Sequence, residues 1–200
     1  MSVIGEATKA IRMTLVLWVL TAIIYPLLIL AIAQVAFPFQ ANGSLVQNLD
    51  GKIVGSALIG QAFTSDQYFS SRPSITNYSQ GKEAAPTGLS GASNLAPSNP
   101  DLLKRIQTEI DRLQQTNVQP TADLVYTSGS SLDPHITVDS AIAQLERVAT
   151  ARNLSIEDIA PLISEHTQSR FLGIFGEPRV NVLDLNRKLD IFAFSRQQTQ

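Results

Sequence analysis

The feature that most constrains this chain is a long uncharged stretch close to its N-terminus. No charged residue occurs between Arg12 and Asp50, and the 25 residues of Met13–Phe37 are apolar except at a few positions, which are Thr14, Thr21, Pro26 and Gln34. At a helical rise of about 1.5 Å per residue, such a run is roughly 37 Å long and can cross a hydrocarbon core of about 30 Å. The sequence therefore predicts a transmembrane helix over residues 13–37.

Four residues inside the predicted span are candidate sites for bending and helix packing. Pro26 lacks a backbone N–H, so a kink is expected at Tyr25-Pro26, which a membrane helix tolerates. Thr21, Tyr25 and Gln34 provide polar groups through which the helix can pack on partner helices. The alternative is that a span with so few polar residues needs no partner.

Two other interpretations of the apolar run are open. A core helix of a soluble protein would carry an apolar stripe, whereas apolar residues surround this helix on all sides. A cleaved signal peptide would fit Lys9, Arg12 and the triplet Ala31-Ile32-Ala33. However, Met13–Leu30 already contains 18 residues, more than the usual apolar core of about 7–15 residues, so a retained anchor is favoured.

The charges that flank the run predict its orientation. Lys9 and Arg12 precede it together with Glu6, whereas no positive charge follows it before Lys52. The positive-inside rule then makes residues 1–12 a short cytoplasmic tail. Residues 38–200 are expected outside the plasma (inner) membrane, in a single-pass protein with a cytoplasmic N-terminus.

Residues 38–200 contain no second apolar span and are expected to form one domain. Ile53–Ile59 is short and β-branched, which predicts a strand in which Gly55 marks a bend or a close approach. Residues 60–99 are rich in Ser, Gly, Asn and Pro, yet they are not poor in large apolar residues as disordered linkers are. This segment is expected to be irregular but ordered, held by Phe63, Tyr68, Phe69, Ile75, Tyr78 and Leu89.

The rest of the domain mixes helices and strands without regular alternation. Helices are predicted from Pro100, after a cap at Ser98 or Asn99, from about Val138 to Ala151, and from Ser155, where Asp158 completes an approximate capping box. Short strands are predicted at Leu124–Tyr126 and Arg179–Val182, and a short C-terminal helix at Leu185, Leu189 and Phe192. The pattern indicates an α+β domain with a small sheet, three or four helices and long ordered loops.

The sequence offers few residues for catalysis or metal binding. It contains no cysteine, which excludes thiolate catalysis, and its net charge of −2 provides no basic surface for nucleic acid. His135 and His166 have no ligand partners at metal-site spacing, and no GxSxG, GxxxxGK[ST] or GxGxxG motif occurs. His166 is expected at the negative end of the third helix, and His135, which follows a turn, is expected to be exposed. No catalytic residue, metal or cofactor of its own is predicted. Two classes remain: an accessory subunit of a membrane complex, or a stand-alone membrane-anchored extracytoplasmic binding protein or unrecognised hydrolase.

Seven short motifs decide between these classes because they occur in the order found in one known family. They are Tyr25-Pro26, Phe37 to Ser44, Gly55 to Phe63 (GSALIGQAF), Tyr68-Phe69 with Arg72-Pro73-Ser74, Ser93-Asn94-Leu95 with Ser98-Asn99-Pro100, Arg147 to Ala149 with Ala151 to Leu154, and Gly176 to Val182 with Leu185-Asn186. Each motif alone is weak. Together, across nearly the whole chain, they resemble the C subunit of the Kdp potassium-transporting ATPase of bacteria and archaea.

The resemblance implies a function that the residues alone do not. In such complexes a channel-like A subunit binds potassium, a P-type B subunit hydrolyses ATP, and a small fourth subunit is often present. The C subunit has one membrane helix and an extracytoplasmic domain over the A subunit. It is needed for assembly and has been described as a catalytic chaperone that raises the ATP affinity of the B subunit. Membrane lipid and these subunits are thus the implied partners, and ATP and potassium belong to the complex through its other subunits.

One segment is a candidate contact with the A subunit. The run LSGASNLAPSNP, residues 89–100, is polar and ends at the predicted helix cap. The alternative is that it only connects two elements. The candidate contact residues are Ser90, Gly91, Ser93, Asn94, Ser98 and Asn99.

Overall fold

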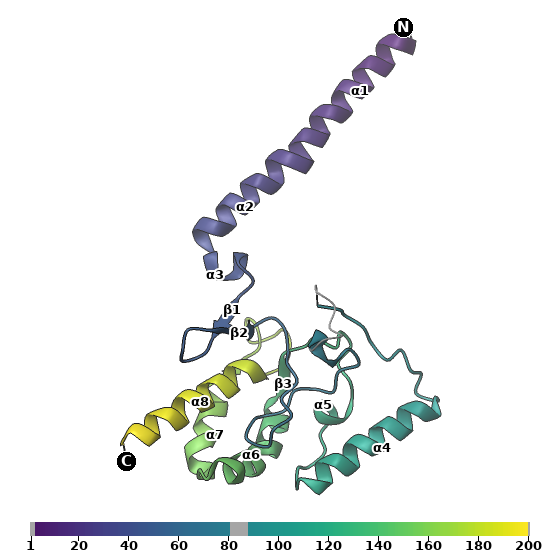
Figure 1. Cartoon of the computed structure of the whole chain (residues 1–200). Coiled ribbons are helices and arrows are strands. Elements are labelled where there is room, and N and C mark those ends of the chain that lie inside the picture. The colour runs from purple at the N-terminus through teal and green to yellow at the C-terminus, as the bar shows by residue number, and fades with distance from the viewer. Residues whose placement is uncertain (1–2, 81–87, 200) are drawn as a thin grey trace. The chain divides into compact units, whose positions relative to one another are not determined.

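The chain divides into two units, residues 1–45 and 46–200, each described by itself. The computed structural model describes residues 3–80 and 88–199. In the first unit, α1 (Val3–Val19), a π-helical turn η1 (Leu20–Ile24) and α2 (Tyr25–Ala36) form one continuous helical rod (Figure 1), which a short helix α3 (Pro38–Ala41) follows. The predicted tail is therefore helical from Val3 onward.

The rod has the length and the composition of a membrane span. It has 34 residues, Val3–Ala36, and its most apolar 18-residue window is strongly hydrophobic and is not buried among the described residues. Proline disturbs the helix at the expected place, but the disturbance is a widened turn just before it. The Tyr25 N–H bonds to the Leu20 carbonyl, five residues back. A π-type turn makes room for the Pro26 ring, which would clash with the carbonyl four residues earlier in a regular helix.

The second unit contains two small antiparallel sheets. In the first, β1 (Leu45–Gln47) pairs with β2 (Ile53–Ser56). In the second, β5 (Arg179–Asn181) lies between β3 (His135–Thr137) and β4 (Thr167–Gln168). The register places Ile136 opposite Val180 and Thr167 opposite Val180 on its other side. The helices are α4 (Pro100–Gln115), α5 (Ala122–Val125), α6 (Val138–Arg152), α7 (Ile156–Glu165) and α8 (Val182–Thr199), which confirms the α+β class.

Three of these helices begin at capping residues, two of which, Asn99 and Ser155, were predicted. Asn99 Oδ1 accepts a hydrogen bond from the Asp101 N–H at 2.9 Å and caps α4. Thr137 caps α6 through the Ser140 N–H. Ser155 and Asp158 exchange side chain-to-backbone bonds in both directions, so the capping box of α7 is complete. Each cap satisfies N–H groups that have no partner within the helix.

Other local predictions were wrong. Leu124–Tyr126 is not a strand, because residues 122–125 form the single helical turn α5 and bury Leu124 and Val125. The C-terminal helix α8 has 18 residues and is not short. The strand predicted at Ile53–Ile59 ends at Ser56, and the strand β3 was not predicted. Gly55 does mark a close approach, since a Cβ there would lie 1.9 Å from Gln61 Nε2.

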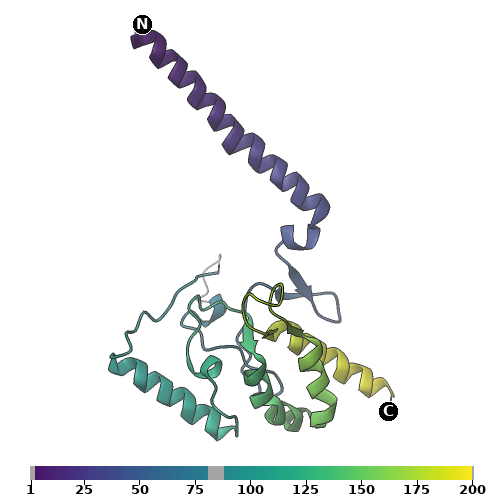
Figure 2. The ribbon, with the colours of Figure 1, turned by 180° about the vertical axis from the view of Figure 1, so that it is seen from behind.

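The main core lies where α6, α7 and α8 meet the three-stranded sheet (Figure 2). These helices and the sheet contribute the fully buried side chains of Ile136, Val148, Ile159, Val180, Leu185 and Leu189. The irregular segment contributes one more, Phe69. A second cluster joins α4 and α5 through Leu113, Val118, Leu124 and Val125. Burial of this apolar surface is the main favourable contribution to folding.

Two buried side-chain amides hold the irregular segment against this core. Asn186 in α8 accepts from the Phe69 N–H at 2.8 Å and donates to the Phe69 carbonyl at 2.9 Å. Gln144 in α6 accepts from the Ser70 N–H at 2.7 Å and donates to the Ser70 carbonyl at 3.3 Å. We call Asn186 and Gln144 the amide clamp. It gives an extended backbone the hydrogen bonds that a neighbouring strand would otherwise supply.

The segment is held by fewer apolar residues than expected. Phe69 and Tyr78 are buried, and Phe63 packs against the core. The side chains of Ile75 and Leu89, in contrast, are 48% and 57% exposed and are not part of the core. Residues 81–87 of the segment lie outside the described residues, so its predicted order is observed only for 60–80 and 88–99.

Replacing Asn186 with leucine is expected to destabilise the protein strongly. Leucine has a similar volume but leaves the buried N–H and carbonyl of Phe69 without partners, at a cost of about 2–5 kcal/mol. Urea unfolding of the detergent-solubilised chain, followed by circular dichroism, measures the loss. Gln115→Leu on the exposed face of α4 is the matched control. An unchanged midpoint for Asn186→Leu would show that the clamp is not needed for stability.

Candidate functional site

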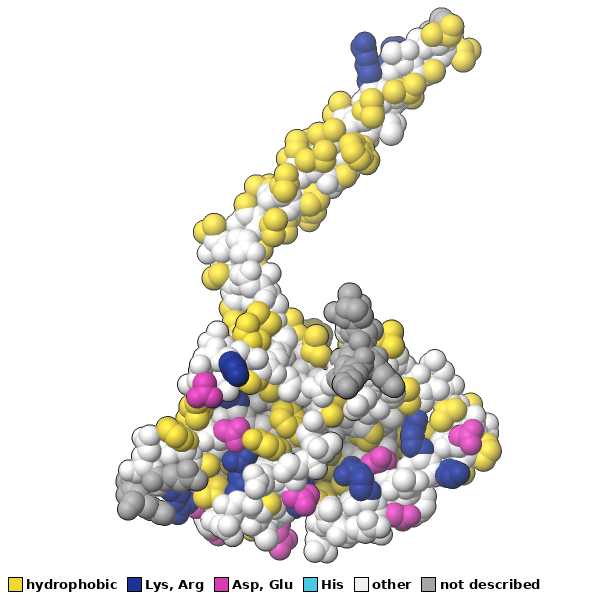
Figure 3. Space-filling model, in the orientation of Figure 1, with side chains coloured by type: hydrophobic (Ala, Val, Ile, Leu, Met, Phe, Trp, Pro, Cys, Tyr) yellow, Lys and Arg dark blue, Asp and Glu magenta, His cyan; other side chains and the backbone are white. Residues whose placement is uncertain are grey.

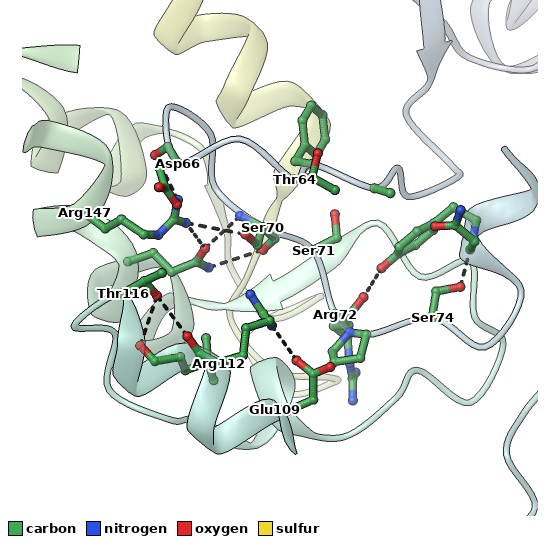
Figure 4. Close-up of a pocket in the computed structure, with 17 residues that line it drawn as sticks. Thr64, Asp66, Ser70, Ser71, Arg72, Ser74, Glu109, Arg112, Thr116 and Arg147 are labelled. Carbon is green, nitrogen blue, oxygen red and sulfur yellow. Dashed lines mark hydrogen bonds and ion pairs between the residues drawn. The ribbon is translucent and has the colours of Figure 1, made fainter. Parts of the chain in front are cut away.

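A polar pocket of about 380 Å³ lies beside the amide clamp. The irregular segment, α4 and α6 contribute its walls, and charged and hydroxyl side chains point into it from all three (Figure 4). The guanidinium-bearing residues are Arg72, Arg112 and Arg147, and the acidic ones are Asp66 and Glu109. The residues of this pocket come together only in the fold, so the pocket could not be predicted from the sequence.

Arg147 is the most buried charged residue of the pocket. Its side chain is 9% exposed, and it donates to the carbonyls of Asp66 and Tyr68 at 2.9 and 3.0 Å and to Gln144 Oε1 at 2.8 Å. Burial lowers the pKa of the Arg147 guanidinium, while the Asp66 carboxylate raises it. The guanidinium thus acts as a structural cation that fixes the irregular segment and orients the Gln144 amide.

Arg72 and Tyr78 form the opposite side of the pocket. The Arg72 guanidinium lies 3.4 Å from Asp133 and 3.7 Å from Asp123, and the Tyr78 hydroxyl donates to the Arg72 carbonyl. Burial raises the pKa of Tyr78 to about 12, so this hydroxyl stays protonated as a donor at neutral pH. These contacts bind the residues to one another and leave no nucleophile paired with a base among them.

Asp133 is the acceptor at the centre of a second small cluster. The His135 N–H donates to Asp133 Oδ1 at 3.0 Å, and His135 Nδ1 lies 3.2 Å from the same oxygen. Partial burial raises the pKa of Asp133, but the hydrogen bonds from His135 and the charges of His135 and Arg72 outweigh it and lower the pKa. The carboxylate form is therefore stabilised by the folded structure.

The predicted contact segment is ordered at its two ends. Ser90 Oγ and the Gly91 N–H both donate to the Ser130 carbonyl at 3.1 Å, and Asn99 caps α4. Asn94 is exposed and has a left-handed backbone with φ of 51°. Ser93 is partly buried and Ser98 is exposed. The segment therefore offers a fixed polar edge, and its role as a contact stays a prediction.

The residues predicted to pack the membrane helix on partner helices lie in the first unit, residues 1–45. Thr21 Oγ1 donates to the Leu17 carbonyl at 2.7 Å, so its hydroxyl is satisfied by its own helix. Tyr25 is 62% exposed, and Gln34 Oε1 accepts from Asn42 Nδ2 at 3.2 Å. Pro26 follows the widened turn. Whether any of these residues contacts a partner helix stays a prediction.

The described residues contain no group of three or more His, Asp or Glu side chains placed to bind a metal ion. His166 ends α7, with Nδ1 2.8 Å from the Leu162 carbonyl, and this agrees with its predicted place at the negative end of that helix. His135 is partly buried on β3 and not exposed as expected. The two histidines thus interact with their own surroundings.

The structure defines a class of protein: a small α+β unit that follows one helix long and apolar enough to cross a membrane. A family model described as "K+-transporting ATPase, c chain" matches residues 7–191. Proteins named potassium-transporting ATPase KdpC subunit are 57% identical in an Anabaena species, over 100% of both chains, and 61% identical in a Synechocystis species, over 90% of this chain and 95% of the relative. The chain belongs to the KdpC family, the C chains of potassium-transporting ATPases.

Lowering the pH is expected to remove the contribution of Asp133 to stability. A group whose pKa is lower in the folded state than its ordinary value of 3.8 stabilises the fold fully above that pH and less as pH falls through the folded-state pKa. The melting temperature of Asp133→Asn should therefore lie below that of the unmodified protein at pH 6, and the gap should shrink below pH 3.8. Asp111→Asn, at an exposed carboxylate of α4, is the control. A gap that stays constant with pH would contradict the prediction.

Proposed function

We propose that this chain is the non-catalytic accessory subunit that assembles a potassium-transporting ATPase, with its helix in the membrane and residues 38–200 on the extracytoplasmic side. The family match carries the proposal, because the full-length relatives are named as subunits of such an ATPase. A subunit of a membrane complex also accounts for a 34-residue helix that is long and apolar enough to cross a membrane. A stand-alone binding protein accounts for the helix but not for the family.

The partners of the chain are, in this proposal, the potassium-binding A subunit, the ATP-hydrolysing B subunit and a small fourth subunit. The domain covers the potassium entrance of the A subunit, and the helix packs on membrane helices of the complex through Tyr25 and Gln34. Potassium selectivity is built elsewhere, since selective filters use rings of backbone carbonyls. The polar pocket supports a structural role for this chain, because its guanidinium groups are bonded to carbonyls and carboxylates of the chain itself.

An effect of this subunit on ATP affinity would be indirect. Lys9 and Arg12 support a cytoplasmic N-terminus and therefore an extracytoplasmic domain. The nucleotide and the phosphorylated aspartate of a P-type ATPase lie in the cytoplasm, on the opposite side of the membrane. The chain would thus act on ATP hydrolysis by holding the complex in its active arrangement.

Reconstitution tests the assembly role directly. Potassium-stimulated ATP hydrolysis is measured for the A–B complex without this chain, with the full chain, and with residues 40–200 alone. Only the full chain is expected to restore the rate, and the ATP concentration for half-maximal activity should stay the same. Restoration by residues 40–200, together with a higher apparent ATP affinity, would overturn both the role of the anchor and the proposed topology.

The contact segment can be tested with a pair of matched substitutions. Asn94 and Asn117 are both exposed and both left-handed, with φ of 51° and 55°. Glycine tolerates this backbone, so Asn94→Gly removes the amide without strain. If the segment contacts the A subunit, Asn94→Gly should reduce the amount of A subunit that co-purifies with the chain, by severalfold in high salt, whereas Asn117→Gly should not. Equal recovery with both variants would leave the segment a connector only.

A further inference from the structure

An exposed apolar loop joins β4 to β5. Four large apolar side chains at its tip are mostly exposed: Phe171 is 70% exposed, Leu172 73%, Ile174 72% and Phe175 63%. Soluble surfaces rarely expose so many large apolar residues together, and such patches mark sites of interaction. We call residues 171–175 the apolar loop.

The backbone of the apolar loop is fixed by its own hydrogen bonds. The Phe171 N–H donates to the Phe175 carbonyl at 2.9 Å, and the Phe175 N–H donates to the Phe171 carbonyl at 3.0 Å. Leu172 and Gly173 form the turn with positive φ of 52° and 73°. A non-glycine residue with positive φ is uncommon. The hydrogen-bonded turn therefore holds these side chains in an exposed position.

The apolar loop lies at the end of its unit where the chain enters from the helix. Figures 1 and 2 both place it beside β1 and β2, the first strands of the unit, and Figure 3 shows hydrophobic side chains at this end. Asn181 in β5 donates to the Ala57 carbonyl at 2.8 Å, which fixes the segment after β2 against the strand that follows the loop. Further exposed apolar residues belong to the β1–β2 end: Leu49 at 54%, Ile53 at 59% and Leu58 at 63%.

Chain length limits how far this end can be from the membrane. Val46, where the second unit begins, is ten residues after Ala36, the end of α2. Fully extended, ten residues span at most about 35 Å, and the helical turn at Pro38–Ala41 shortens that reach. Val46, where the second unit begins, can therefore lie no farther than about 35 Å from the end of α2, and an end of the unit that carries β1 and β2 can reach a membrane surface.

We infer that the apolar loop inserts into the interfacial region of the phospholipid bilayer and forms a second, shallow membrane contact beside the anchor. Phenylalanine, leucine and isoleucine side chains gain free energy by entering this region, and aromatic rings are enriched there. The charged residues at the base of the loop, Arg170, Glu177 and Arg179, are exposed and carry a net charge of +1, which favours anionic headgroups.

A lipid surface fits the loop better than a protein partner does. The tip, residues 171–175, contains only apolar residues and one glycine, so it has no side chain that donates or accepts hydrogen bonds. Protein interfaces surround an apolar centre with polar contacts that fix orientation, whereas a bilayer interface requires only apolar area and tolerates any orientation about the membrane normal. The inference rests on the proposed anchoring by the helix. The test below reports separately on the anchoring of the helix and on the insertion of the loop.

Tryptophan fluorescence in the full chain tests the inference. The sole tryptophan, Trp18, lies in the predicted span and reports on the anchor. In a Trp18→Phe background, Leu172→Trp and Ile174→Trp each report on the loop, and Leu103→Trp, at an exposed position of α4, is the matched control. Each chain is reconstituted into phosphatidylethanolamine–phosphatidylglycerol vesicles with or without bromine on the acyl chains, which quenches fluorescence only by contact.

Both loop variants should show blue-shifted emission and lose most of their intensity in brominated vesicles, while Leu103→Trp keeps its intensity. If Trp18 is quenched but neither loop variant is, the inference is wrong and the anchor stands. If Trp18 itself is not quenched, the anchoring proposal fails. Loop variants that stay unquenched as the chain alone but shift to the blue when the whole pump is assembled would overturn the lipid assignment and give the loop to another subunit.

Discussion

The second unit depends on the amide clamp, in which Asn186 and Gln144 bond to both polar groups of two consecutive backbone units. The segment they hold, around Phe69 and Ser70, has no strand partner, yet Phe69 is fully buried in the main core. Without the clamp, the N–H and carbonyl of Phe69 would be buried without hydrogen bonds, which costs more than a single hydrogen bond contributes. Arg147 extends the clamp, because it bonds to the carbonyls of Asp66 and Tyr68 and to Gln144.

The sequence predicted the elements whose causes are local. The cap of α4 at Asn99, the capping box at Ser155 and the apolar span all follow from residues within one or two turns, and the structure has them. The short apolar run at Leu124 was assigned to the wrong element, because a few apolar residues do not reveal a period. There, Asp123 accepts from the Thr137 N–H at 2.7 Å, a distant contact that favours the helical turn.

The site was less predictable than the fold. Asn186 and Gln144 look in sequence like ordinary polar residues of helices, and only the packing of α6 and α8 turns them toward the backbone of residues 69 and 70. The apolar loop was overlooked for a related reason, since a run such as FLGIF is expected to be buried and its exposure is a property of the tertiary structure. The motif order identified the family, and the comparisons confirmed it.

The amide clamp also determines when, during synthesis, the domain can be completed. Asn186 follows Phe69 by 117 residues, which at about 5–20 residues per second takes the ribosome roughly 6–23 s. During that time the irregular segment has left the ribosome but cannot close, because α8 does not yet exist. The apolar helix is complete long before α8, so in the proposed arrangement the chain is already anchored while its domain is unfinished. The packing of α8, which brings Asn186 to Phe69, therefore completes the domain, and in the proposed arrangement it takes place at the membrane.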